Sequence, residues 1–356
     1  MHPSLRIFAL VREIFRTWTT QSARADQLSD ALQTLLEGFV RNQRLPGAVL
    51  RVTGPGIDAS LAVGKQATTQ TQFYIASAGK MATAAAVLQL VDEGRIRLDQ
   101  RVSEVLTPAG RLARIPNWNN VTIEQLLNHS SGMPDYFSDQ FETDAIKNRR
   151  LLVDVESALQ GLANEAASGP PGRAYEYSNT NFALLGLVLQ RMDGGSLEAS
   201  LSRRVFARAG MASSKVGADP SSQGIASANG GRGAASARAN LIAYSSLLGD
   251  GPVTATAEDM GRFMVALLRD RRMLEAPTLR RMLAPSRHEA DYGLGIERSN
   301  TDWGMAYGHS GCVTGFNSDA WYYADRQTAI VFIANGDYRD DDSANIVEQV
   351  ADIVFR

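Results

Sequence analysis

The chain has 356 residues, of which 44% are hydrophobic, and it carries 36 basic and 38 acidic side chains for a formal net charge of -2. This length and composition predict one or two domains with their own hydrophobic cores. The near balance of charge argues against binding of nucleic-acid phosphates, because proteins that do so carry an excess of lysine and arginine. The single cysteine, Cys312, excludes an internal disulfide and a multi-cysteine metal site, and the four histidines lack metal-ligand spacing, so we expect no metal or other cofactor.

The first 25 residues allow two interpretations. They end in an A-x-A-like pattern before Asp26, as a signal peptide does, but Arg12, Glu13 and Arg16 interrupt the apolar run. Apolar residues also recur there at helical spacing, which predicts an amphipathic helix lying on the domain or on a membrane surface. No later segment has the roughly 18 consecutive apolar residues that a spanning helix needs. We therefore expect no membrane-spanning segment, and at most a peripheral contact from this end.

From residue 26 to residue 356 the sequence predicts one folded unit that begins with a helix near 27–42. Two strand-like runs follow, GAVLRVTG and DASLAVGK, and a Gly-Pro turn signal between them predicts an antiparallel hairpin. Residues 73–99, FYIASAGKMATAAAVLQLVDEGRIRLD, then begin as a strand and continue as a helix.

The middle and the end of the chain differ in pattern. Residues from about 105 to 283 contain the helical patterns TIEQLLNH, DVESALQGLANEA, NFALLGLVLQRM and AEDMGRFMVALLRD, joined by the loop-like segments ASGPPGRAY and ASANGGRGAASARAN. The last part returns to strands, YGLGIER, NSDAWYYAD and TAIVFIANG, and closes on an amphipathic helix, SANIVEQVADIVF.

Strands at both ends with helices between them predict an α/β (α+β) fold. We expect an antiparallel sheet built from both termini and flanked by helices, with a mostly α-helical insertion. The α/β part would comprise about 26–104 and 284–356, and the helical part about 105–283.

A serine and a lysine three residues apart, Ser77 and Lys80, stand where residues 73–99 are predicted to change from strand to helix. This spacing places both side chains on one helix face. A lysine can take the proton of a serine hydroxyl if burial or nearby positive charge lowers its pKa, and a helix that begins at Ser77 would favour negative charge beside it. The plainer alternative is a capping serine followed by a surface lysine, so the pair by itself is weak evidence.

Two further clusters follow in order. Tyr177 stands two residues before Asn179 in RAYEYSNTNFALLG, at the entrance to another helix. A tyrosine whose pKa a lysine lowers can shuttle protons, and an asparagine amide can hold both a lysine and a substrate carbonyl. An ordinary helix entrance capped by Ser178 or Asn179 is the alternative. In YGHSGCVTG, His309 and Gly311 precede a strand-like segment, where a glycine would let the backbone approach a ligand closely.

Together, Ser77-Ala-Gly-Lys80, Tyr177-Ser-Asn179 and His309-Ser-Gly311 resemble the three motifs of the serine β-lactamase and penicillin-binding-protein family. The resemblance is to the branch that holds class C β-lactamases, DD-carboxypeptidases and related esterases. The segments TIEQLLNHSSGMPDY, VTATAEDMGRFM and YGLGIE are also similar to that family, so the resemblance spans about 30–335.

The resemblance implies a role for each residue of the first two motifs. Ser77 would attack an acyl carbonyl and form an acyl-enzyme, while Lys80 and Tyr177 would handle its proton. Asn179 would orient Lys80 and the substrate amide. Which of Lys80 and Tyr177 is the resting base stays open.

The third motif departs from the family pattern. His309 replaces the lysine of the usual Lys-Thr-Gly, so that a permanent cation facing a substrate carboxylate becomes one that titrates near neutrality. The resemblance implies that His309 and Gly311 bind substrate, and that the backbone N–H groups of Ser77 and Cys312 form the oxyanion hole. We expect the Cys312 side chain to be a small buried hydrophobe beside or just behind the cleft. His129, in NHSSG, is expected to fix a loop through its ring nitrogens.

The resemblance favours a DD-carboxypeptidase-like hydrolase of D-Ala-D-Ala peptides, because secreted DD-carboxypeptidases are similar in carrying a histidine in the third motif. A carboxylesterase or a weak β-lactamase of the same family is the alternative. A penicillin or peptidoglycan sensor that is acylated without turnover also stays open. The expected partner is a small-molecule or peptide acyl substrate; a periplasmic or secreted location is favoured, a cytoplasmic one stays open, and the oligomeric state is not indicated.

Overall fold

The structure is a computed structural model that describes residues 26–65, 67–107, 110–152, 154–219, 221–231, 233–245, 247–338 and 345–356. The signal-like or amphipathic segment predicted for residues 1–25 lies outside the described residues, as does any membrane contact it would make. Within these ranges, every helix is too short or too polar to cross a bilayer.

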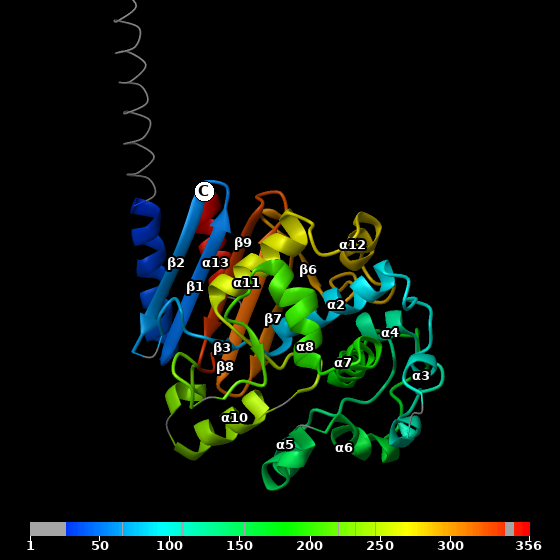
Figure 1. Ribbon diagram of the computed structural model, residues 1–356. Coiled ribbons are helices and arrows are strands. Elements are labelled where there is room, and N and C mark those ends of the chain that lie inside the picture. The colour runs from blue at the N-terminus through cyan, green and yellow to red at the C-terminus, as the bar shows by residue number, and fades with distance from the viewer. Residues whose placement is uncertain are drawn as a thin grey trace, which may run out of the picture.

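A six-stranded antiparallel sheet forms the centre of the fold, with the strands in the order β2-β1-β9-β8-β7-β6 (Figure 1). Its strands are β1 (Gly47–Gly54), β2 (Ile57–Gly64), β6 (Glu297–Thr301), β7 (Gly304–Val313), β8 (Phe316–Tyr323) and β9 (Thr328–Ala334). The first two strands form the predicted hairpin, and β1 pairs with β9, so the sheet joins the two ends of the chain. This architecture confirms the predicted fold class.

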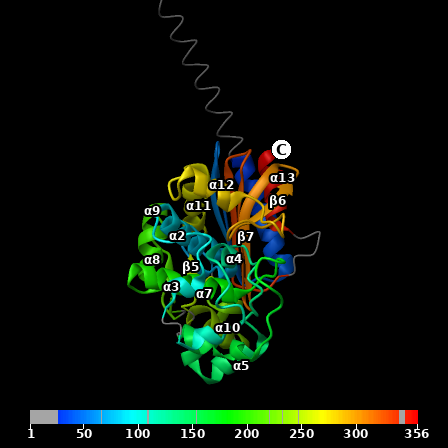
Figure 2. The ribbon, with the colours of Figure 1, turned by 90° about the vertical axis from the view of Figure 1, so that its right-hand side faces the viewer.

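Alternating apolar residues give the sheet two buried faces. On one face, Leu50 and Phe332 pack under the helical residues 26–43 and under α13 (Ile346–Phe355). On the opposite face, the strands pack against α11 (Ala257–Met264) and the α-rich part of the molecule. Figures 1 and 2 show the sheet between these two layers of helices.

The α-rich part of the chain consists of short helices and one small sheet. The helices are α2 (Lys80–Asp92), α3 (Val102–Val105), α4 (Ile123–Leu127), α5 (Asp139–Lys147), α6 (Val155–Leu159), α7 (Asn179–Asp193), α8 (Leu197–Leu201), α9 (Ala207–Ala209), α10 (Gly233–Ser245) and α12 (Ala276–Leu283). Shorter 3₁₀ or π turns are η1 (Ala76–Gly79), η2 (Gly110–Arg114), η3 (Arg149–Leu152), η4 (Gln160–Asn164), η5 (Ser202–Phe206), η6 (Ala228–Gly231) and η7 (Val265–Arg269). The small sheet has the order β3-β5-β4, with β3 (Phe73–Tyr74), β5 (Val253–Ala255) and β4 (Lys215–Val216).

Two predicted segments differ from the structure. The loop predicted over ASANGGRGAASARAN is wrong in its second half, where α10 begins at Gly233, because alanine-rich sequence forms helix readily once it packs. The third motif was expected to precede a strand, but His309 and Gly311 lie inside β7. Three of the ten residues of β7 are glycines, which are depleted in strands, so the sequence pattern conceals this strand.

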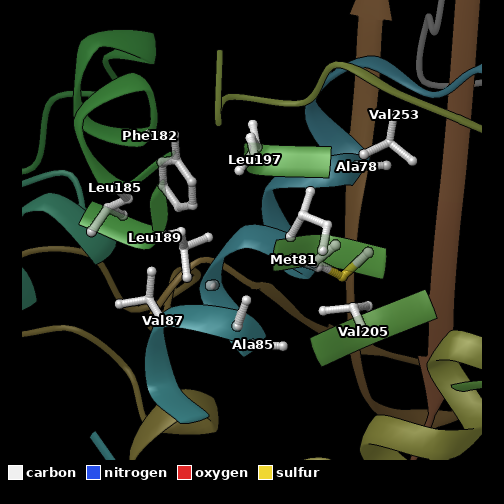
Figure 3. Packing of buried hydrophobic residues seen from close by; sticks show 14 of the residues in the cluster. Ala78, Met81, Ala85, Val87, Phe182, Leu185, Leu189, Leu197, Val205 and Val253 are labelled. Atoms are coloured by element: carbon white, nitrogen blue, oxygen red, sulfur yellow. The ribbon is translucent and has the colours of Figure 1, made fainter. Parts of the chain in front are cut away.

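Helix α2 lies at the centre of the larger hydrophobic core and is buried along nearly its whole length. Figure 3 shows Met81 and Ala85 of α2 among Phe182 of α7, Leu197 of α8 and Val205. Shortening such a buried side chain to alanine typically costs about 2–5 kcal/mol. This packing anchors the start of α2, where the first sequence motif lies.

Candidate active site

Ser77 lies in η1, the single turn that joins β3 to α2. The residue before it, Ala76, has φ 47°, in the left-handed region that costs an L-residue roughly 1–2 kcal/mol. Gly251 passes close to this turn, because a Cβ at Gly251 would lie 2.1 Å from the Ala76 carbonyl oxygen. Surrounding structure therefore holds the serine turn in a strained conformation, as is common where function requires it.

Lys80 is the first residue of α2 and is 0% exposed. Its Nζ donates to Ser77 Oγ at 2.9 Å, to Asn179 Oδ1 at 2.7 Å and to the Asp250 carbonyl oxygen at 2.7 Å. These three acceptors match the three N–H groups of an ammonium. Burial lowers the pKa of Lys80 to about 8, although nearby carboxylates, first that of Asp250, oppose the shift. The alternative of a surface lysine is therefore wrong.

Tyr177 approaches the same serine from the segment that precedes α7. Its hydroxyl donates to Ser77 Oγ at 2.9 Å, and Lys80 Nζ lies 5.0 Å from the centroid of its ring. Burial raises the pKa of Tyr177 well above its ordinary value, while the hydrogen bond to Ser77 opposes the shift. The expectation that the pKa of this tyrosine is lowered is wrong, because loss of solvent raises it and nearby carboxylates, first that of Glu297, add to the rise.

Asn179 is held by a residue that the sequence analysis missed, Asp135. The Asp135 carboxylate accepts from the Asn179 backbone N–H at 3.0 Å and from Asn179 Nδ2 at 2.9 Å. This pair of bonds turns Asn179 Oδ1 toward Lys80 and also places negative charge at the N-terminus of α7. Asp135 stands in the segment SSGMPDY, 44 residues before Asn179. No local sequence pattern connects the two residues, which meet only in the folded protein.

A second missed carboxylate lies on the other side of the lysine. Asp250 offers Lys80 its carbonyl oxygen, and its own Oδ2 accepts from the Tyr136 hydroxyl at 2.6 Å. Burial raises the pKa of Asp250, and the Lys80 ammonium opposes that shift. Within the described ranges, His, Cys, Asp and Glu side chains do not gather in threes that could hold a metal ion.

Strand β7 brings the third motif alongside η1. Gly311 is the point of close approach, because a Cβ there would lie 2.3 Å from the Ile75 carbonyl oxygen and 3.0 Å from the Ala78 nitrogen. This glycine was expected to make room for a ligand, but the backbone of Ile75 and Ala78 takes that space. Side chains alternate along a strand, so Cys312 lies on the opposite face, behind the site. It is exposed, and the expectation of a buried cysteine is wrong.

The backbone of β7 has an open edge beside the site. Strand β6 pairs with β7 only as far as Gly308, so within the described chain residues 309–313 have no strand neighbour on that edge. The Ser310 N–H points to this edge, because it donates to Glu297 Oε2 at 3.3 Å. N–H groups two residues apart point the same way along a strand, so the Cys312 N–H points to the open edge too.

His309 is 1% exposed, and both of its ring nitrogens have partners within the protein. Nε2 lies 3.1 Å from the Tyr292 hydroxyl, and Nδ1 lies 2.6 Å from the Ser310 carbonyl oxygen and 3.1 Å from Glu297 Oε1. Burial, assisted by the charge of Lys80, lowers the pKa of His309 to about 3, and burial raises the pKa of Glu297 to about 7. The expectation that His309 titrates near neutrality and meets a substrate carboxylate as an imidazolium is therefore wrong.

A hollow of about 540 Å³ opens beside Tyr292 and Glu297, the two residues whose side chains contact His309. Acidic and aromatic side chains dominate its lining, which consists of Tyr175, Glu289, Asp291, Tyr292, Glu297, Arg298, Ser299, Asn300 and Trp321. Three carboxylates stand against one guanidinium, so this surface attracts positive charge and repels negative charge.

Comparison with known proteins agrees with this geometry. The Beta-lactamase family model matches residues 32–354. Penicillin-binding protein 4* of Bacillus subtilis (strain 168) is 26% identical over 91% of this chain and 75% of its own length, and penicillin-binding protein 4 of Amycolatopsis lactamdurans is 32% identical over 51% of this chain and 46% of its own length.

Among solved structures, the penicillin binding protein from Bacillus halodurans has a TM-score of 0.73 at 27% identity, covering 90% of this chain and 99% of its own. The D-stereospecific amidohydrolase from Streptomyces sp. has a TM-score of 0.74 at 24% identity, covering 90% of this chain and 97% of its own, and shows that the fold is shared. The chain therefore belongs to the Beta-lactamase family, a family of serine hydrolases.

Proposed function

We propose that this protein is a serine hydrolase that forms a covalent acyl-enzyme at Ser77. The observation that carries the proposal is the position of Ser77 Oγ, which lies 2.9 Å from Lys80 Nζ and 2.9 Å from the Tyr177 hydroxyl. A nucleophile within hydrogen-bond reach of a base, with the base oriented by a third group, is the general arrangement of nucleophilic catalysis. Asn179 is the orienting group here.

Lys80 is the base in this proposal, because its pKa is lowered to about 8 whereas the pKa of Tyr177 is raised. The neutral amine takes the proton of Ser77 as Oγ bonds to the acyl carbon. Tyr177 donates its proton to the leaving group, and the Lys80 ammonium on the other side of Oγ restores it. The N–H groups of Ser77 and Cys312 would stabilise the oxyanion. Water then cleaves the acyl ester by the same proton route.

Two substrate classes fit this chemistry. The motifs that resemble those of DD-carboxypeptidases, together with the similarity to penicillin-binding proteins, support an acyl-D-Ala-D-Ala peptide, which is cleaved next to a terminal carboxylate. The charges around the site favour a second class, amides and esters without that carboxylate. A neutral His309 supplies no cation, and the carboxylates of the hollow, with Glu297 among them above its pKa of about 7, would repel an anion. We therefore propose amides and esters with an uncharged leaving group as better substrates than D-Ala-D-Ala peptides.

A matched pair of substrates separates these classes. N-acetyl-D-Ala-D-Ala and N-acetyl-D-Ala-D-alaninamide share the scissile bond and differ only in the terminal carboxylate or carboxamide. We expect a higher kcat/KM for the carboxamide and for a short-chain nitrophenyl ester. A higher kcat/KM for the free acid would reverse our ranking of the two substrate classes. It would not contradict the proposed acyl-enzyme at Ser77.

Intact-mass analysis after incubation with the ester and with penicillin tests the acyl-enzyme itself. We expect an adduct on the native protein and none on Ser77→Ala. Release of one equivalent of product followed by a stable adduct with every substrate would identify a sensor, and full turnover by folded Ser77→Ala would sink the proposal.

A further inference from the structure

Tyr292 and Glu297 contact the ring of His309, and the Tyr292 hydroxyl joins that ring to a second buried imidazole, His129. His129 follows α4, Tyr292 precedes β6 and Glu297 begins β6. The two histidines and Tyr292 are almost wholly buried, at 0%, 1% and 2% exposed for His129, His309 and Tyr292. Buried imidazole and phenol groups must satisfy their hydrogen bonds within the protein, so the direction of each bond can be derived.

The direction is determined first at His129. Its Nδ1 lies 3.1 Å from the backbone N–H of Ser178 and 3.1 Å from Asn181 Nδ2. The Ser131 hydroxyl donates to Asn181 Oδ1 at 2.6 Å, which identifies Nδ2 as the donor side of that amide. Nδ1 of His129 therefore accepts hydrogen bonds and carries no proton. The proton of the neutral ring is on Nε2, which donates to the Tyr292 hydroxyl oxygen at 3.2 Å.

The Tyr292 hydroxyl links His129 to His309 on strand β7. Since the Tyr292 oxygen accepts from His129, its own hydrogen goes to His309 Nε2 at 3.1 Å. His309 then carries its proton on Nδ1, which faces the Ser310 carbonyl and the Glu297 carboxylate, both acceptors. The hydrogen bonds run in one direction from His129 through Tyr292 to His309, whose Nδ1–H donates to the Ser310 carbonyl oxygen with Glu297 Oε1 3.1 Å away. A second proton on either ring would leave a buried donor facing a donor.

His129, the first donor of this hydrogen-bond chain, also packs against Tyr177. The His129 ring stacks on the Tyr177 ring with centroids 4.3 Å apart and an interplanar angle of 26°. Both neighbours of Tyr177 are bonded to His129 as well, since the Glu176 N–H donates to its carbonyl oxygen at 2.7 Å and the Ser178 N–H donates to its Nδ1. The orientation of the His129 ring therefore decides where the Tyr177 hydroxyl lies.

We propose that His129, Tyr292 and Glu297 are positioning residues: they hold Tyr177 against Ser77 and keep His309 neutral through one directed hydrogen-bond chain. This inference rests on the proposed function, because the Tyr177 hydroxyl acts in that proton route. Glu297 ends the chain at the hollow and is its partly exposed member. The hydrogen-bond chain thus links the position of the buried Tyr177 to a carboxylate that lines the hollow.

The ionisation of Glu297 makes the hydrogen-bond chain depend on pH. The charged and titratable groups around it are Lys80 from α2, Tyr177 and Tyr175 from the segment before α7, Tyr292, Glu289 and Asp291 from the loop before β6, Arg298 of β6, and His309 of β7. Burial raises the pKa of Glu297 to about 7, and Lys80 opposes the shift. Protonation of Glu297 removes the carboxylate that His309 faces, and it also removes one of the negative charges that, after those of Asp250 and Asp135, oppose the lowering of the Lys80 pKa by burial.

Kinetics on Tyr292→Phe and Glu297→Gln test the chain with the nitrophenyl ester. Tyr292→Phe deletes the one hydroxyl that joins the two imidazoles and should lower kcat at least about tenfold with KM little changed, because Tyr177 loses its fixed position. Glu297→Gln keeps an acceptor for His309 but cannot ionise, so its acid limb of kcat/KM should move to lower pH. Tyr307→Phe in β7 is the matched control, since its hydroxyl has no hydrogen-bond partner within the described part of the chain, and it should retain native kinetics.

A second readout does not depend on turnover. In histidine labelled with ¹⁵N, we expect His129 as the neutral Nε2–H form and His309 as the neutral Nδ1–H form from pH 5.5 to 8, with both signals altered in Tyr292→Phe. Titration of either ring in that range in the native protein would overturn the chain, as would native kcat together with unchanged signals in Tyr292→Phe. If every substrate fails but the predicted tautomers are found, the proposed function is wrong and the hydrogen-bond chain stands, without its assigned role.

Discussion

Lys80→Met removes a buried cation and should remove the pH dependence of stability that this lysine creates. Lys80 is 0% exposed, and burial lowers its pKa from 10.5 to about 8. A shift of this size corresponds to about 3 kcal/mol of difference between the charged and neutral forms. Because the amine is fully buried, solvent screening does not reduce this figure.

The sign of the effect follows from proton binding in the two states. The unfolded chain keeps the lysine proton up to about pH 10.5, whereas the folded protein releases it near pH 8. Between these values the unfolded state binds more protons, so the free energy of unfolding of the native protein rises with pH. Relative to Lys80→Met, the native protein should gain about 2 kcal/mol between pH 8 and pH 10. Starting at pH 8 keeps Glu297 largely ionised in the native protein.

Urea unfolding followed by circular dichroism at pH 8, 9 and 10 measures this difference. Groups common to both proteins cancel in the comparison. Lys215→Met serves as the control, because Lys215 is exposed in β4 and its loss should leave the native pH dependence unchanged. A stability difference between native protein and Lys80→Met that stays constant within about 0.5 kcal/mol over this range would refute the assignment of a depressed lysine pKa.

Three further substitutions test the geometry of the site. Gly311→Ala should cost about 1–3 kcal/mol in urea unfolding, because the new Cβ would lie 2.3 Å from the Ile75 carbonyl oxygen; native stability would contradict that close approach. Asp135→Ala frees the Asn179 amide and should lower kcat for ester hydrolysis roughly 100-fold with a smaller change in KM, and an unchanged kcat would show that Asn179 needs no such support. Cys312→Ala keeps the backbone N–H and should retain most activity, whereas Cys312→Pro removes it and should lower kcat about 100-fold or more. Normal kcat in Cys312→Pro, shown by circular dichroism to be folded, would place the oxyanion donor elsewhere.

The sequence by itself determined the order of the elements and the identity of the central side chains. A Gly-Pro turn between two apolar runs predicts the β1–β2 hairpin, and local spacing predicts that Ser77 and Lys80 share a face. Tyr177 stands out because it precedes a helix at the right distance from Asn179. These inferences succeed because they depend on neighbours within a few residues, where backbone geometry limits the arrangements.

Only the tertiary structure decided the charge states and the supporting contacts. Lys80 meets Asn179 and Asp250, 99 and 170 residues further along the chain, and such partners leave no local pattern. Burial reversed the expected behaviour of Tyr177, whose pKa is raised, and of His309, which is neutral, because the cost of desolvating a charge depends on the whole packed core. The sequence motifs predict which side chains form the site, and the packing around those side chains determines which of them can carry charge.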